Sequence, residues 1–139
     1  MASELEVKNA DKVLSMLQQI DGITYERVTD DVFLVNETES GNGLSMTIDA
    51  EESVVCLIMD IMDIPENADY RCDVLEDLLK INDTAVHGKF CVSGSKILFK
   101  DNLEAENMDQ NELEASMAHM FLTIAQNMEK LFADRVVTA

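Results

Sequence analysis

The chain has 139 residues, of which 47% are hydrophobic and 27% charged, and its formal net charge at pH 7 is −18. This length suits a single domain spanning residues 1–139, and the apolar fraction is too high for a disordered chain. Because an anionic surface repels nucleic acid phosphates and anionic lipid head groups, we expect neither a nucleic acid nor a membrane partner.

The compartment follows from what the sequence lacks. The longest apolar run, residues 54–59, is far shorter than the ~20 residues of a membrane-spanning helix. The opening MASELEVKN has neither the basic nor the apolar region of a secretory signal. Cys56, Cys72 and Cys91 are odd in number and stand in apolar surroundings, which is typical of reduced core thiols. We therefore expect a cytoplasmic protein.

The first predicted element is a helix that begins after Ser3 and ends before Gly22. Ser3 and Glu6 have the spacing of a capping box, in which each residue bonds the other's backbone amide. Apolar residues then recur every three or four positions, as one buried face of a helix requires. They are Ala10, Val13, Leu14, Leu17 and Ile20.

Three strands are predicted next, at residues 32–35, 44–48 and 53–62. In the middle one, Leu44, Met46 and Ile48 alternate with polar residues, so one face lies in the core and the other in water. The first and third are apolar on both faces, which predicts that both faces are covered. The short polar turns between them favour an antiparallel meander.

The second half of the chain predicts a helix, a hairpin and a last helix. Asp69 can cap the helix, which ends near Asn82. KFCV and KILF then flank Ser93-Gly94, a pair suited to a tight hairpin turn. The acidic stretch 101–112 is interpreted as a solvated loop that ends in a helix cap. The last helix follows from the apolar period of Leu113, Met117, Met120, Phe121, Ile124, Met128 and Leu131.

The predicted fold class is therefore α+β, in the order helix, three-stranded antiparallel meander, helix, β-hairpin, helix. Helices on one side of such a sheet would leave the second apolar face of residues 53–62 uncovered. Dimerisation is the economical way to cover it.

No constellation of catalytic or metal-binding residues is recognisable. His87 and His119 lie on different predicted elements, and neither has the spacing of a zinc ligand pair. The sequence contains no nucleophile motif and no phosphate-binding loop. We expect no enzyme activity, no cofactor and no metal. The nine methionines fit either a filled core or an adaptable partner-binding face.

The second half of the chain resembles a known family. The segments LEDLLKIND, HGKFCVSGSKILFKDNL and MDQNELEASMAHMFLTIAQNMEKL, between about residues 75 and 131, place a glycine-containing hairpin after an LL-x-x-N helix and before a final amphipathic helix. This pattern is similar to the type III secretion chaperone-like superfamily, which includes the class I secretion chaperones and the YbjN-type proteins. The resemblance implies a homodimeric α/β sandwich that binds an extended segment of a secreted protein without catalysis.

The same resemblance implies two sets of site residues. The groove for the secreted client would be formed by Leu14, Leu17, Leu44, Met46 and Ile48, with burial of all five inside the monomer as the alternative. The dimer interface would involve the second helix and the nearby strands, through Val74, Leu78, Phe90 and Phe99. The YbjN-type relatives leave an alternative open, namely a regulatory or adaptor domain in a bacterial stress or signalling role.

Overall fold

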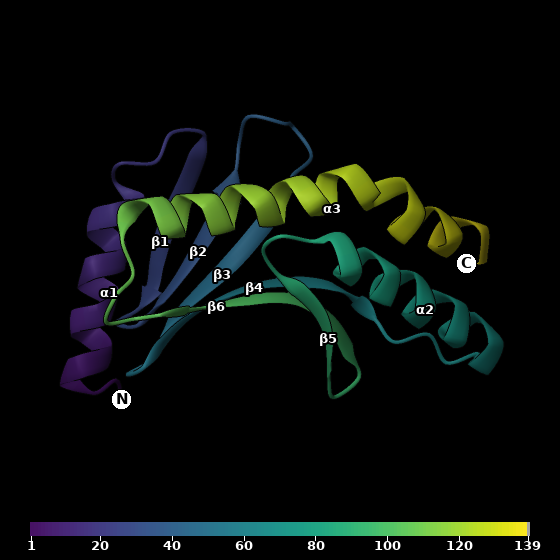
Figure 1. Ribbon diagram of the computed structural model, residues 1–139, viewed down its shortest axis with the longest axis horizontal. Coiled ribbons are helices and arrows are strands. Elements are labelled where there is room, and N and C mark those ends of the chain that lie inside the picture. The colour runs from purple at the N-terminus through teal and green to yellow at the C-terminus, as the bar shows by residue number, and fades with distance from the viewer. Residues whose placement is uncertain (139) are drawn as a thin grey trace.

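The computed structural model describes residues 1–138 of the chain, and side chains through residue 131. Within these residues, six strands form one antiparallel sheet, and three helices pack against it (Figure 1). The strands lie side by side in the order β1-β2-β3-β4-β6-β5. The elements are α1 (Glu4–Leu17), β1 (Ile23–Thr29), β2 (Val32–Glu37), β3 (Ser45–Ala50), β4 (Val54–Asp63), α2 (Ala68–Thr84), β5 (Lys89–Ser93), β6 (Lys96–Glu104) and α3 (Gln110–Thr138). The predicted α+β class is confirmed.

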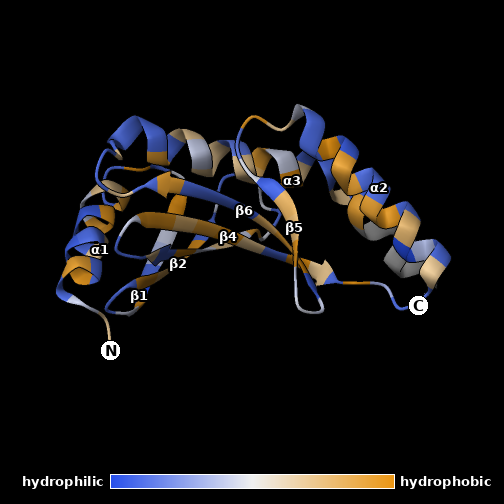
Figure 2. Cartoon of the chain, turned by 60° about the horizontal axis from the view of Figure 1, so that its bottom comes forward, coloured by the Kyte–Doolittle hydropathy of each residue, from blue (hydrophilic) through white to orange (hydrophobic). Residues whose placement is uncertain are grey.

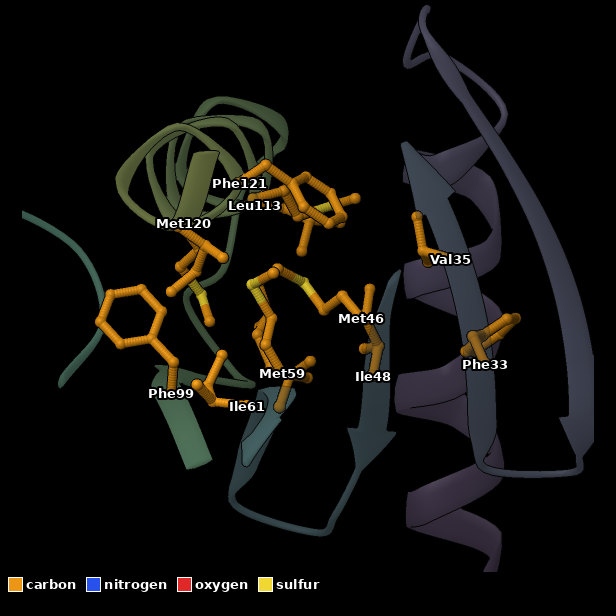
Figure 3. Packing of buried hydrophobic residues seen from close by; sticks show 14 of the residues in the cluster. Phe33, Val35, Met46, Ile48, Met59, Ile61, Phe99, Leu113, Met120 and Phe121 are labelled. Atoms are coloured by element: carbon orange, nitrogen blue, oxygen red, sulfur yellow. The ribbon is translucent and has the colours of Figure 1, made fainter. Parts of the chain in front are cut away.

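The core lies between one face of the sheet and the helices α1 and α3. Burial alternates along β2 and β3, where every second side chain is buried. Met46 and Met59 reach from the sheet toward Met120 of α3 (Figure 3). Among the hydrogen bonds that tie α1 to its surroundings, Asn9 donates its side-chain amide to the carbonyls of Glu51 and Glu52, at 2.8 and 3.0 Å. The α1 helix is therefore fixed to the β3–β4 turn.

The helix α2 borders the β5 edge of the sheet. The side chain of Asn82 accepts a hydrogen bond from the Phe90 amide at 2.7 Å and donates one to the Phe90 carbonyl at 3.3 Å. Asn82 thus pairs with β5 as a neighbouring strand would. Asn82 is also the asparagine of the LL-x-x-N pattern, and its role in the structure is to bond the backbone of β5.

The helix starts are local features of the sequence. The capping box of Ser3 and Glu6 is confirmed, since each side chain accepts from the other's backbone amide. Asp109 likewise accepts from the Glu112 amide at 2.8 Å at the start of α3. The predicted cap of α2 is wrong, because Asn67 rather than Asp69 accepts from the Tyr70 amide. Asp69 instead lies in the first turn, where its charge favours the helix dipole.

Two strands differ from the prediction. The sequence does not predict β1: its burial pattern has no buried residue, because it is an edge strand, and alternation gives no signal there. Residues 101–104, predicted as loop, are the second half of β6. They pair with β4 from Leu57 to Val54, so the polar stretch is held by backbone bonding and not by apolar burial. The predicted hairpin is confirmed, with Gly94 at a positive φ in its turn.

Candidate protein-binding surfaces

Most of the predicted client-binding residues lie in the core of the chain. Leu17, Met46 and Ile48 are at most 1% exposed, packed between the sheet and the helices. They offer a client almost no surface in this structure, although Met46 borders the hollow described next. Leu14 and Leu44 are partly buried and pack against the same core. Leu44 lines a hollow of about 340 Å³ where β3 begins beside β4.

The predicted dimer residues surround the junction of α2 with β5 and β6. Phe90 and Phe99 face each other across these strands, with ring centroids 4.6 Å apart. They are mostly or fully buried, as is Leu78, and Val74 is partly buried. Exposed apolar side chains nevertheless occur in the same part of the chain. Leu79 lies on α2, Val86 follows it, and Val92 lies on β5, with 67, 77 and 55% of their surfaces exposed.

The open face of the sheet carries a partly apolar row. Leu34, Thr47, Ile58 and Lys100 are neighbours across β2, β3, β4 and β6, and none is fully buried. The sequence predicts that both faces of β2 and β4 are covered, but within this chain the second face is only half-buried. Figure 2 views the molecule with β4 and β6 in front of α3, and much of β4 has hydrophobic colouring.

A groove of about 460 Å³ lies between α3, the α1–β1 turn and the β2–β3 loop. We call it the α1–α3 groove. Its apolar lining includes Ile20, Ile23, Met117, Phe121 and Leu122. Leu122 is 52% exposed, whereas the other large apolar residues of α3 with described side chains are buried or partly buried. The groove therefore offers apolar surface to a binding partner.

Acidic side chains line the same groove. They are Asp21, Glu37, Glu39 and Glu114. Hydrogen bonds from the Ser40 hydroxyl and the Ser40 amide lower the pKa of Glu37, so this carboxylate stays ionised in mild acid. Gly22 adopts a φ of +80° in the α1–β1 turn, and a Cβ there would lie 2.5 Å from the Glu39 carboxyl carbon. The glycine thus leaves room for Glu39 at the edge of the groove.

A third hollow, of about 560 Å³, lies beside the first half of α1. Its lining includes Leu5, which is 45% exposed, and the two lysines Lys8 and Lys12. Lys12 donates to the Ala105 carbonyl at 3.0 Å. The two differ in charge: this hollow is lined by two lysines and by Glu52 and Glu106, whereas the charged residues that line the α1–α3 groove are all carboxylates.

The two histidines, distant in sequence, meet in the structure. Their ring centroids are 5.0 Å apart, and His87 Nδ1 lies 3.4 Å from Asp101 Oδ2. The same oxygen accepts from the Ser116 hydroxyl at 2.6 Å. Ser116 is fully buried, so this hydroxyl anchors α3 to β6 and does not face solvent. In the part of the chain with described side chains, no group of three His, Cys, Asp or Glu residues could hold a metal ion.

The three cysteines differ in burial, whereas the sequence predicts that all three lie in the core. Cys56 is buried, Cys91 is intermediate and Cys72 is exposed on α2, so the prediction of three core thiols is wrong for Cys72. Burial, with help from a bond that the Cys56 thiol donates to Glu51 at 3.2 Å, raises the pKa of Cys56 to about 12. Cys56 is therefore a protonated structural thiol and not a nucleophile. Among the described residues, no helix has the length and apolarity to cross a bilayer.

Asp49, on the half-buried face of β3, gives a prediction about stability. Burial raises the pKa of Asp49, and the charges of Glu51, Asp31 and Glu6 raise it further. A carboxyl whose folded pKa exceeds its unfolded one stabilises the fold at low pH, and this contribution disappears as the pH rises through the folded value. We expect Asp49→Asn to raise the free energy of unfolding at pH 7 and to change it little below pH 3.8, the ordinary pKa of this group.

Urea unfolding of Asp49→Asn at a series of pH values measures this effect. The exposed Asp73→Asn on α2 removes the same charge and is the matched control. A gain at pH 7 equal to that of the control would mean that only net charge is involved. An equal gain at both ends of the pH range would mean that protonation of Asp49 is not the cause.

Comparison with known proteins finds one family model, CesT_Tir_1, which matches residues 6–134. No curated protein matches the chain. An uncharacterized protein from Methanothermobacter thermautotrophicus is similar in structure, with a TM-score of 0.63 and 10% identity over 91% of this chain and 98% of that one. The heterodimeric ExoU-SpcU complex from the type III secretion system of Pseudomonas aeruginosa matches with a TM-score of 0.49 and 10% identity, over 83% of this chain and 87% of that chain.

Proposed function

The chain belongs to the CesT_Tir_1 family of type III secretion chaperones, and from this membership we propose that it binds an extended segment of a secreted protein and keeps it soluble and export-competent. The observation that carries the proposal is the extent of the family match, which includes almost every element from α1 to α3. We propose that this role is non-catalytic and that it is carried out in the cytoplasm.

The surface properties of the chain support this role. An extended client segment needs apolar surface that the chaperone has not already buried, and the α1–α3 groove and the half-buried sheet face both offer it. The net charge of −18 keeps such a complex soluble while apolar surface is exposed. The predicted client residues Leu17, Met46 and Ile48 would then support the groove from inside the core, and would not contact the client directly.

We propose further that the chain acts as a homodimer through the region of α2 and β5. The exposed Leu79, Val86 and Val92 are the side chains that a second copy could cover. Val74, Leu78, Phe90 and Phe99 would hold this surface in place from within each copy. Light scattering on the purified chain measures the oligomeric state directly.

Site-specific photo-crosslinking tests the client proposal. A photoreactive residue at position 122 faces the α1–α3 groove, and one at the exposed position 73 on α2 is the matched control. Each variant is expressed in the source organism, illuminated and analysed by mass spectrometry. We expect position 122 to crosslink to one secreted protein, within one short segment, and position 73 not to do so.

Two outcomes would contradict the proposal. Crosslinks to many unrelated proteins at both positions would mean that the apolar surface is merely adhesive. Crosslinks to a single cytosolic regulator would favour the alternative of a regulatory adaptor. Either result leaves the family membership unchanged, since that rests on the sequence match.

A further inference from the structure

We infer that the α1–α3 groove selects client segments in which a large apolar side chain is flanked by lysine or arginine. This inference rests on the proposed function, because it names the class of segment that the groove would accept. It is carried by the lining of the groove, which combines an apolar floor with charges of a single sign.

The floor sets the apolar part of the requirement. Phe121 and Met117 form its buried base and are held in place by the core. Leu122 is half-exposed at its side, and Ile20 and Ile23 close it from the α1–β1 turn. With a volume of about 460 Å³, the groove is large enough for one or two large apolar side chains. Burying such side chains is the main source of affinity.

The rim sets the charge requirement. Its four carboxylates come from three separate parts of the chain: the α1–β1 turn, the region of β2 and the loop after it, and α3. No lysine, arginine or histidine is among the described residues that line the groove. Glu114 accepts a bond from the neutral Gln110 amide at 3.2 Å, so its charge is not neutralised by this contact. Cations beside the apolar side chain would therefore be attracted from three directions.

The net acidity of the chain alone does not account for this arrangement. The hollow beside the first half of α1 is comparable in size, yet its charged lining is balanced, with Lys8 and Lys12 against Glu52 and Glu106. A basic segment would meet charges of both signs there, and so no net attraction from the lining. The structure thus distinguishes a hollow with charges of one sign from a hollow with balanced charges on the same acidic surface, and the difference can be tested at the level of single sites.

Fluorescence anisotropy with two synthetic peptides tests the inference on the full chain. In the first labelled peptide, a central Leu-Phe pair has two lysines on each side, and in the second, glutamates replace the lysines. We expect the lysine peptide to bind on the order of tenfold more tightly, with the difference shrinking as salt is raised. Leu122→Ser should weaken the binding of the lysine peptide severalfold without unfolding the chain, because Leu122 is already half-exposed.

Paired charge variants locate the effect. Asp21→Asn combined with Glu39→Gln removes two exposed carboxylates of the rim, and Glu66→Gln with Asp73→Asn removes two exposed carboxylates elsewhere. We expect the rim pair to lower the affinity for the lysine peptide severalfold more than the control pair does. Equal losses in the two variants would overturn the inference, as would no binding of either peptide or an equal affinity for both.

These results are independent of the crosslinking result. A secreted client that crosslinks at position 122, together with equal losses from both charge pairs, would leave the proposed function standing and remove the charge preference. A charge preference without any crosslinked secreted client would keep the charge preference and remove the proposed function.

Discussion

Gly88→Ala is expected to lower the free energy of unfolding by about 2 to 5 kcal/mol. Gly88 lies between α2 and β5 with a φ of +85°, where an alanine costs about 1 to 2 kcal/mol in backbone strain. A Cβ at this position would lie 2.7 Å from the Phe99 ring and 3.1 Å from Met120 Cγ. Phe99 and Met120 are fully buried, so neither can move aside without disturbing the core. Overpacking of this kind adds about 1 to 3 kcal/mol.

Gly94→Ala separates the two contributions. Gly94 also has a positive φ, of +59°, but a Cβ added to it in the hairpin turn would have no neighbouring atom within 4 Å. It should therefore lose only the backbone part, about 1 to 2 kcal/mol. Urea unfolding of both variants gives the comparison. If the two losses were equal, the close approach of Gly88 to Phe99 would have no energetic importance.

Replacement of Asn82 has the second large expected effect. Asn82→Ala removes both hydrogen bonds to the backbone of Phe90, a residue that is only 8% exposed. Leaving buried backbone groups unpaired costs about 1 to 3 kcal/mol. Asn82→Asp should cost at least as much at neutral pH, because one carboxylate oxygen would replace the donor that faces the Phe90 carbonyl. Acid should restore part of the loss by protonating that oxygen.

Hydrogen exchange and urea unfolding together test this role of Asn82. Exchange of the Phe90 amide should accelerate in Asn82→Ala more than exchange in the central strand β4. Asn127→Ala is the control, since among the residues with described side chains Asn127 donates to the Thr123 carbonyl within its own helix, at 2.7 Å, and to no other element. A loss in Asn82→Ala no larger than in this control would mean that water replaces the side chain without cost.

The elements with strong apolar periodicity could be predicted from the sequence, and those held by backbone pairing could not. The buried stripe of α3 and the alternation of β3 each reflect one face in the core. β1 and the end of β6 contain no such pattern, because β1 is an edge and residues 101–104 are mostly polar. These segments are strands because they pair with other parts of the sheet, and the local sequence pattern carries no information about that pairing.

The candidate surfaces were harder to predict for a related reason. Met46 and Ile48 were expected at the client groove, yet the same apolar character places them in the core. The α1–α3 groove brings Asp21, Glu39 and Glu114 together from separate elements. Their positions in the sequence form no regular spacing from which the groove could be predicted. One sequence signal for this groove does exist. Leu122 is an apolar residue that lies outside the helical period of the buried residues of α3, and such a residue can indicate a binding surface.

The order of the strands has a consequence for synthesis of the chain on the ribosome. β4 pairs with β3, which precedes it, and with β6, which emerges only after α2 and β5. Until β6 is made, the side of β4 that it will pair with is an open edge of a largely apolar strand, and Met46 and Met59 are not yet covered by α3. The nascent protein thus passes through a partly folded state that is prone to aggregation. A chain whose proposed task is to shield unfolded segments would need rapid translation, or shielding of its own, to reach its native form.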